Sequence, residues 1–245
     1  MTMNQTVLIT GGTKRIGLAI TQCLHKNGYN VIVSFNKSHA DAKKIFTDLN
    51  KKRENSCSII KMQLSKTGDY QKLYNKALKF FGRIDALVNN ASQFYPTTIK
   101  QITEKNWSNL IETNLKAPLF LSKVFYPELK KRKGVIINII DIHVDPPLKN
   151  HIIYSISKSG LLTLTKSLAK ELSPHVRVNG ISPGAILWPT TQKSSKRKKE
   201  IILKVALKRP GEPEDIANAV KFLIQDGNYI TGQNINIDGG RKLNM

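Results

Sequence analysis

Thr6-Val7-Leu8-Ile9-Thr10-Gly11-Gly12-Thr13-Lys14-Arg15-Ile16-Gly17 is the stretch that decides the fold of this chain. Its first five residues are apolar or β-branched, and they predict a buried strand. The glycines that follow predict a tight turn, and residues 15–26 have the pattern of a helix. A buried strand joined to a helix by so short a turn is typical of a parallel sheet.

The same alternation continues along the rest of the chain. Further strands are expected at 30–34, 58–62, 84–88, 135–140, 176–181 and 233–237, with helices at 40–50, 70–81, 103–129 (interrupted near Pro118), 154–172 and 216–224. This order predicts an α/β fold, a single-domain doubly wound Rossmann-type parallel sheet flanked by helices on both faces. We expect one domain over residues 1–245, with an irregular, polar insert at 188–199 inside a loop of about 185–210.

Composition limits the class of protein. The chain has 245 residues, of which 40% are hydrophobic, as in ordinary soluble globular proteins. It shows no signal-peptide pattern and no apolar span, and its two cysteines have no metal-ligand or disulfide spacing, so we expect a cytoplasmic protein without metal. The net charge of +22 is spread over nearly every predicted helix. Without a recognisable nucleic-acid module, we expect no specific nucleic-acid partner and no membrane.

One pair of residues indicates proton transfer. Tyr154 and Lys158 are four residues apart, so they lie on one face of a helix. An ammonium beside a phenol is expected to lower the pKa of the tyrosine, so that the phenol can exchange a proton near neutral pH. Asp141, which ends the apolar run at 135–140, precedes the tyrosine by thirteen residues. The alternatives are a chance surface pair and an aspartate that only caps a strand end.

The glycine turn after the first strand suits a dinucleotide. Glycines let the backbone approach a pyrophosphate, and the helix N-terminus offers free N–H groups. The second strand ends in Ser34-Phe35-Asn36-Lys37-Ser38, with no acid until Asp41. An acid at this point would favour NAD, whereas cations favour the 2′-phosphate of NADP. Lys37 and Ser38, with Lys14 and Arg15 from the first turn, therefore indicate NADPH; the alternative for Lys37 is an ordinary surface lysine.

Taken together, these residues resemble the short-chain dehydrogenase/reductase family. The resemblance covers nearly the whole chain and rests on motifs in the family's order: the glycine turn, Asn89-Asn90-Ala91-Ser92, Asn114, Tyr154-x-x-x-Lys158, Pro183-Gly184 and Ile237-Asp238-Gly239-Gly240. It implies a nicotinamide-dependent oxidoreductase. It also implies a homotetramer built on two long helices.

Within that family the chain looks like a pteridine reductase. Arg15 stands where the usual turn has its middle glycine, Asp141 stands where the catalytic serine is usual, and Ala91-Ser92-Gln93-Phe94-Tyr95-Pro96 is similar to the segment whose Phe stacks on the pterin. One position departs from the pattern, because Gln63 replaces the usual Asp before Leu-Ser near the adenine. Gln can still donate and accept hydrogen bonds, so adenine binding is expected to survive.

The resemblance implies a role for each matching residue. The catalytic residues would be Asp141, Tyr154, Lys158 and Asn114, with Asn114 supporting the lysine through a water. The cofactor-binding residues would be Gly11, Lys14, Arg15, Ile16, Gly17, Lys37, Ser38, Gln63, Leu64, Asn90, Ala91, Ser92, Pro183 and Gly184. The substrate-binding residues would be Arg15, Ser92, Phe94, Asp141, Tyr154 and Trp188.

The sequence thus predicts NADPH-dependent reduction of dihydropterins to their tetrahydro forms, with dihydrofolate as a further candidate substrate. The first alternative is a reductase of 3-oxoacyl thioesters or small ketones from the same family, against which Asp141 and Phe94 argue. The second is a non-catalytic cofactor-sensing or polyanion-binding protein. The presence of Tyr154, Lys158 and Asn114 together argues against that alternative.

Overall fold

The computed structural model describes residues 4–64, 70–186 and 195–245, except the side chains of 195–198. In this part of the chain the backbone forms one sheet of seven parallel strands, in the order β3-β2-β1-β4-β5-β6-β7. The strands are β1 (Thr6–Thr10), β2 (Asn30–Phe35), β3 (Cys57–Lys61), β4 (Ala86–Asn89), β5 (Val135–Ile139), β6 (Arg177–Pro183) and β7 (Asn234–Ile237).

Strand β5 shows why these residues form a central strand. All five of its residues are buried, and Ile137 pairs with Val88 of β4 on one side and Asn179 of β6 on the other. A strand covered on both faces is largely apolar rather than alternating, and the one polar residue of β5, Asn138, is hydrogen-bonded to Asn89 and Thr165. Because every strand runs in the same direction, their carboxyl ends share one edge of the sheet. The strand order reverses between β1 and β4, where such folds bind ligands.

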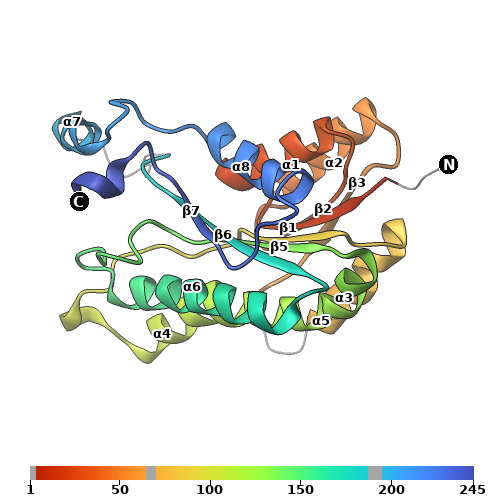
Figure 1. Cartoon of the computed structure of the whole chain (residues 1–245), viewed down its shortest axis with the longest axis horizontal. Coiled ribbons are helices and arrows are strands. Elements are labelled where there is room, and N and C mark those ends of the chain that lie inside the picture. The colour runs from red at the N-terminus through yellow and green to blue at the C-terminus, as the bar shows by residue number, and fades with distance from the viewer. Residues whose placement is uncertain (1–3, 65–69, 187–194) are drawn as a thin grey trace.

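Helices cover both faces of the sheet (Figure 1). One layer holds α1 (Arg15–Lys26), α2 (His39–Lys52) and α8 (Pro213–Gln225), and the other holds α3 (Tyr70–Phe81), α4 (Glu104–Ile111), α5 (Ala117–Arg132) and α6 (Ile152–Leu172). Each layer has its own apolar core against the sheet, around Ile20 and Val220 on one face and around Leu121 and Phe125 on the other. The predicted fold class is confirmed.

The structure makes one local prediction more exact and corrects another. The long helix is interrupted near Pro118, as predicted, and the interruption is a π-helical turn at Glu112–Lys116. Pro118 itself lies in the first turn of α5, where proline is tolerated. The insert expected to be irregular contains a helix, α7 (Ser195–Lys204), and residues 241–244 form a 3-10 turn, η3. A second 3-10 turn, η1 (Ile99–Gln101), follows β4. None of the described helices is long and apolar enough to span a membrane.

Candidate active site

The catalytic residues predicted from the sequence meet at the carboxyl edge of the sheet. Tyr154 and Lys158 lie on the first turns of α6, and Asp141 follows β5. The Tyr154 hydroxyl donates a hydrogen bond of 2.6 Å to Asp141 Oδ2, and the backbone N–H of His143 donates one of 2.8 Å to Oδ1. The aspartate therefore does more than cap a strand end, because it is bonded directly to the candidate acid.

Lys158 lies under this pair and is fully buried. Its ammonium donates to the carbonyl oxygen of Ile139 at 2.8 Å and lies 5.9 Å from the centre of the Tyr154 ring. Burial lowers the pKa of Lys158 to about 8, while the charge of Asp141 opposes that shift. The charge of the Lys158 ammonium therefore changes with pH around pH 8.

The expected effect of Lys158 on Tyr154 is wrong in this structure. Burial raises the pKa of Tyr154 well above its ordinary value, and the charge and the hydrogen bond of Asp141 raise it further. The phenol is therefore a neutral donor held by a carboxylate, not a partly ionised group. The sequence could not show this, because the reversal depends on burial and on the 2.6 Å contact.

Asn114 is positioned by the π-helical turn between α4 and α5. Its Nδ2 donates to Gln93 O at 3.0 Å and to Ser157 Oγ at 3.0 Å, and its Oδ1 accepts from Gln93 N at 2.8 Å and from Ser92 Oγ at 3.2 Å. A π-helical turn inside an α-helix is often found at functional sites. Asn114 therefore ties the segment after β4 to α6, and its link to Lys158 stays a prediction.

The turn after β1 is shaped to receive a phosphate group. Gly11 has φ +63°, and a Cβ on Gly17 would lie 2.3 Å from the Gly11 carbonyl oxygen, so neither position takes a side chain readily. The Asn90 amide donates to Thr10 O at 2.9 Å and to Gly11 O at 3.1 Å, which fixes the turn against β4. These contacts fit the backbone approach that a pyrophosphate needs.

Arg15 begins α1 in a left-handed conformation, with φ +52°. Such a conformation is uncommon for a residue with a Cβ and is often retained where a side chain has a function. This explains why many related turns would use glycine here. The Arg15 side chain is exposed, as is Lys14, whose ammonium pairs with Asp41 at 3.0 Å, and Ile16 packs against the core beside Gly17.

A cavity of about 170 Å³ lies at the carboxyl ends of β1 to β4. Its walls are formed by Gly11, Ser34, Phe35, Asn36, Met62, Leu64, Ala91, Ser92, Gln93 and Thr113. Four residues of the predicted cofactor set line it, and the place fits the adenosine half of a dinucleotide. Gln63 is exposed and is not among the lining residues. Lys37 is exposed and Ser38 is the N-cap of α2, both beside this cavity's Asn36.

The end of β6 closes the other side of the site. Ile142 N donates to Pro183 O at 3.4 Å, which places Pro183 beside the loop that carries Asp141. A Cβ on Gly184 would lie 2.6 Å from Asp238 Cα, so only glycine lets the chain after β7 approach this closely. Trp188 lies outside the described residues. A larger cavity, about 450 Å³, lies between α8 and the end of β7, and no predicted catalytic residue lines it.

Phe94, the predicted stacking residue, is 49% exposed and lies beside Tyr154. Its ring meets the Tyr154 ring edge-on, with centres 4.8 Å apart and planes at 81°. On one face it stacks on His151, with centres 4.7 Å apart and planes at 12°. Ser92, by contrast, is bonded to Asn114 and Gln93 rather than to Phe94.

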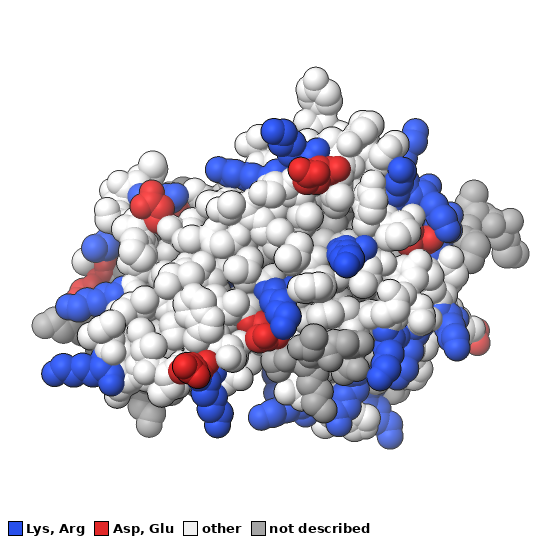
Figure 2. All heavy atoms as spheres, turned by 90° about the horizontal axis from the view of Figure 1, so that it is seen from below, with Lys and Arg blue, Asp and Glu red and all other residues white. Residues whose placement is uncertain are grey.

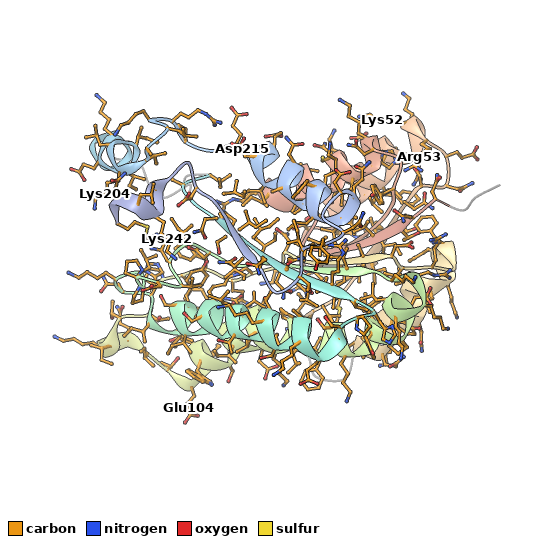
Figure 3. The ribbon with its side chains drawn as sticks, in the orientation of Figure 1. Lys52, Arg53, Glu104, Lys204, Asp215 and Lys242 are labelled. Carbon is orange, nitrogen blue, oxygen red and sulfur yellow. The ribbon has the colours of Figure 1, made fainter. Side chains whose placement is uncertain are left out.

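The sequence patterns did not indicate three further residues at this edge, namely His143, Arg241 and His151. His143 is bonded to Asp141 through its backbone, and burial lowers the pKa of its ring. Arg241, at the start of η3, has a buried Nε with no hydrogen-bond partner in the described part of the chain, and burial lowers its pKa while Asp141 opposes that shift. Figure 3 places Lys242, its neighbour, between α7 and the loops that lead into α6. His151 is the third. No motif spacing marks any of them.

The parallel sheet, its glycine turn and the buried Tyr154–Lys158 pair define a Rossmann-type oxidoreductase. The family model for short chain dehydrogenases matches residues 5–200, and this chain belongs to the short-chain dehydrogenase/reductase family.

Curated relatives agree with that assignment. The chain is 34% identical to a 3-oxoacyl-[acyl-carrier-protein] reductase FabG of Staphylococcus epidermidis, over 97% of this chain and 99% of the relative. It is 32% identical to the enzyme of that name from Staphylococcus aureus, over 98% and 99%. It is also 34% identical to dehydrogenase/reductase SDR family member 4 of Homo sapiens, over 97% and 87%. None of these three is named as a pteridine reductase, so that finer resemblance stays a prediction.

Proposed function

We propose that the chain uses NADPH to reduce the C=N bond of a dihydropterin, and that dihydrofolate is a possible further substrate. The observation that carries this proposal is the 2.6 Å hydrogen bond from Tyr154 to Asp141. A carboxylate occupies the place where most members of the family have a neutral hydroxyl. We therefore prefer a substrate on which positive charge develops during the reaction, because a nearby carboxylate stabilises positive charge.

The charge that develops on the substrate decides between the candidates. A ketone oxygen becomes negative as hydride arrives, and neutral donors stabilise it, whereas a nearby carboxylate would repel it. An imine nitrogen instead takes up a proton and passes through a cationic form, which Asp141 would stabilise.

The protein's own groups complete the proton transfer. When bound, NADPH supplies the hydride. Tyr154 passes its hydroxyl proton to the substrate nitrogen, and the charged form of Lys158 stabilises the phenolate that remains. Asp141, freed from the hydroxyl, accepts a hydrogen bond from the protonated edge of the substrate.

The choice of NADPH is supported by the end of β2. Asn36, Lys37 and Ser38 follow the strand without an acid, and the N-terminus of α2 adds free N–H groups. Lys14 is a weaker contributor than the sequence suggested, because its charge is paired with Asp41 at 3.0 Å. Lys37 is the cation in this group for which we expect the largest effect on NADPH binding.

A second candidate is the reduction of 3-oxoacyl thioesters, and the names of the two staphylococcal relatives favour it. A spectrophotometric assay of NADPH oxidation with dihydrobiopterin, dihydrofolate and an acetoacetyl thioester, run side by side, separates the two. Turnover of the pterin or folate alone supports the proposal. Turnover of the thioester alone means that the chain is a ketone reductase. Turnover of none would favour a non-catalytic role.

The Asp141→Ser variant tests the role of the carboxylate. We expect it to lower kcat for the dihydropterin by about 100-fold, because a positioned acid–base group contributes about that much or more. The dissociation constant of NADPH should change less than about twofold, since Asp141 is assigned to the chemical step. If Asp141→Ser keeps the pterin activity of the wild type, this mechanism is wrong.

We also propose that the chain forms a homo-oligomer through the layer of α4, α5 and α6. Large apolar side chains are exposed there, namely Trp107, Leu119, Ile152 and Ile156. Figure 2 looks onto this layer, where broad uncharged areas surround a few charged side chains near the middle, and more Lys and Arg lie toward the rim. Exposed apolar patches of this kind mark interfaces. Light scattering of the purified protein tests for the tetramer implied by the family resemblance.

A further inference from the structure

His151 lies three residues before the catalytic tyrosine, at the N-cap of α6, and its backbone is fixed there. Its N–H donates to Leu148 O at 3.2 Å, and its carbonyl oxygen accepts from Ser155 N at 2.9 Å. The ring is fixed as well, because Nδ1 lies 2.9 Å from Lys149 O. A carbonyl oxygen only accepts, so Nδ1 carries the hydrogen in this contact.

The loop before His151 is fastened to the segment that carries Phe94. Asn150 is left-handed, with φ +64°, and its carbonyl oxygen accepts from Thr97 N at 2.7 Å. The buried Thr97 hydroxyl in turn accepts from Ile153 N at 3.3 Å. These hydrogen bonds therefore fix the distance between residues 94–97 and the start of α6. The stacked rings of Phe94 and His151 come from these two segments, one ring from each.

Phe94 depends on this neighbour for its orientation. It lies in the irregular segment between β4 and η1 and is 49% exposed, so its ring is only partly packed. His151 covers one face at 4.7 Å, and Tyr154 meets the edge at 4.8 Å. A ring restricted in this way binds a ligand without the entropy cost of being ordered first.

We propose that His151 is a positioning residue that holds Phe94 in the orientation in which its exposed surface stacks on a planar heteroaromatic substrate beside the Tyr154 hydroxyl. This inference rests on the proposed function and specifies how the substrate class is recognised. A flat bicyclic ring would use the aromatic surface, whereas the flexible chain of an acyl thioester has no planar group to stack there. His151 thus selects for planar substrates without contacting them.

Three variants test the proposal: His151→Ala, which removes the stack; His151→Phe, which restores a stacking ring without the Lys149 hydrogen bond; and His175→Ala, a control at an exposed histidine after α6. Thermal unfolding first establishes that each variant is folded. KM and kcat are then measured with dihydrobiopterin and with an acetoacetyl thioester. The dissociation constant of oxidised folate is measured by fluorescence titration in the presence of NADP⁺.

For His151→Ala we expect KM for the pterin and the dissociation constant of folate to rise about 3–10-fold, the range that the energy of one aromatic pair gives. The change in kcat should stay below about threefold, and any slow turnover of the thioester should not change. His151→Phe should return both binding constants to within about threefold of the wild type, and His175→Ala should match the wild type.

Several results would overturn the inference. Unchanged pterin and folate binding in His151→Ala would show that Phe94 needs no support from the histidine. A fall in kcat at constant KM would place His151 in the chemical step instead. Equal damage from His151→Phe and His151→Ala would show that the ring stack is not the cause. If the wild type reduces no pterin but binds folate, the proposed function fails while the binding constants still test His151; if it does neither, both fail.

Discussion

Asp85 and Asp141 are acids at opposite edges of the same sheet, and they differ in how completely they are paired. Asp85 precedes β4 at the amino edge, where Arg83 binds both of its oxygens, at 2.6 Å and 2.9 Å, and Thr6 N donates to it at 2.8 Å. All of these donors belong to the fold itself. Such a full set of donors, two of them from a charged guanidinium, holds a buried carboxylate firmly in place.

Asp141, at the carboxyl edge, accepts a hydrogen bond from a group that can give up its proton. Tyr154 holds it at 2.6 Å through a hydroxyl whose proton is transferable, and the nearby ammonium of Lys158 bonds to Ile139 O rather than to the carboxylate. Figure 3 shows the two edges well separated, with Lys52 and Arg53 near the amino edge and Lys242 near the carboxyl edge. The difference is that the donor to Asp141 carries a transferable proton, whereas the donors to Asp85 are a guanidinium and a backbone N–H.

The largest effect on stability is expected at the fully paired edge. Asp85→Ala should lower the free energy of unfolding by about 3–5 kcal/mol, because it removes the buried carboxylate to which Arg83 and the Thr6 N–H donate. Urea unfolding measures this change. Asp48→Ala removes the exposed pair with Lys44 and should cost less than about 1 kcal/mol. If Asp85→Ala lowers the free energy of unfolding as little as Asp48→Ala does, the buried pair at the amino edge contributes no more than an exposed pair, and the contrast between the two edges fails.

At the carboxyl edge, removing a buried charge, that of Lys158, is expected to raise the free energy of unfolding rather than lower it. Burial holds the pKa of Lys158 at about 8, below the ordinary 10.5, so the unfolded chain binds this proton more tightly than the folded chain. The resulting destabilisation is fully present below pH 8 and fades as the pH rises toward 10.5. Lys158→Met should therefore raise the free energy of unfolding by about 2–3 kcal/mol at pH 7 and by little near pH 10, while it abolishes activity.

The check is urea unfolding of the wild type and of Lys158→Met at both pH values, with Lys170→Met, an exposed lysine of the same helix, as the matched control. The control should show no gain at either pH. A Lys158→Met variant that is less stable than the wild type at pH 7 would mean that the buried ammonium contributes to the fold, as Arg83 does.

The smallest effect is expected in the glycine turn. Arg15→Gly relieves a left-handed residue and should raise the free energy of unfolding by about 0.5–1 kcal/mol. If Arg15 also contacts the cofactor or the pterin, as the family resemblance implies, the same variant should raise KM several-fold. Lys133→Gly is the control, because Lys133 is left-handed too, with φ +49°, but lies at the end of α5 at the amino edge. We expect Lys133→Gly to raise the free energy of unfolding by a similar amount and to leave KM unchanged. If the two variants have the same KM, Arg15 does not contribute to binding.

Periodicity and turn chemistry predicted most of the fold, and the reason is physical. A strand buried on both faces needs a largely apolar run, so the limits of β1 and α1 follow from residues 6–26 alone. The π-helical turn at Glu112–Lys116 did not follow, because it depends on the contacts of Asn114 with Gln93 and Ser157 and not on local propensity.

By itself, the sequence determined the parallel sheet, the glycine turn and the presence of Asp141, Tyr154 and Lys158 at one edge, because strand direction and residue spacing place them there. Only the tertiary structure decided their protonation, since burial and the 2.6 Å bond to Asp141 raise the pKa of Tyr154. It alone also brought His151 against Phe94, residues 57 positions apart (151 − 94) with no spacing motif between them. Electrostatics and packing depend on distances in space, and the order of residues in the chain does not contain those distances.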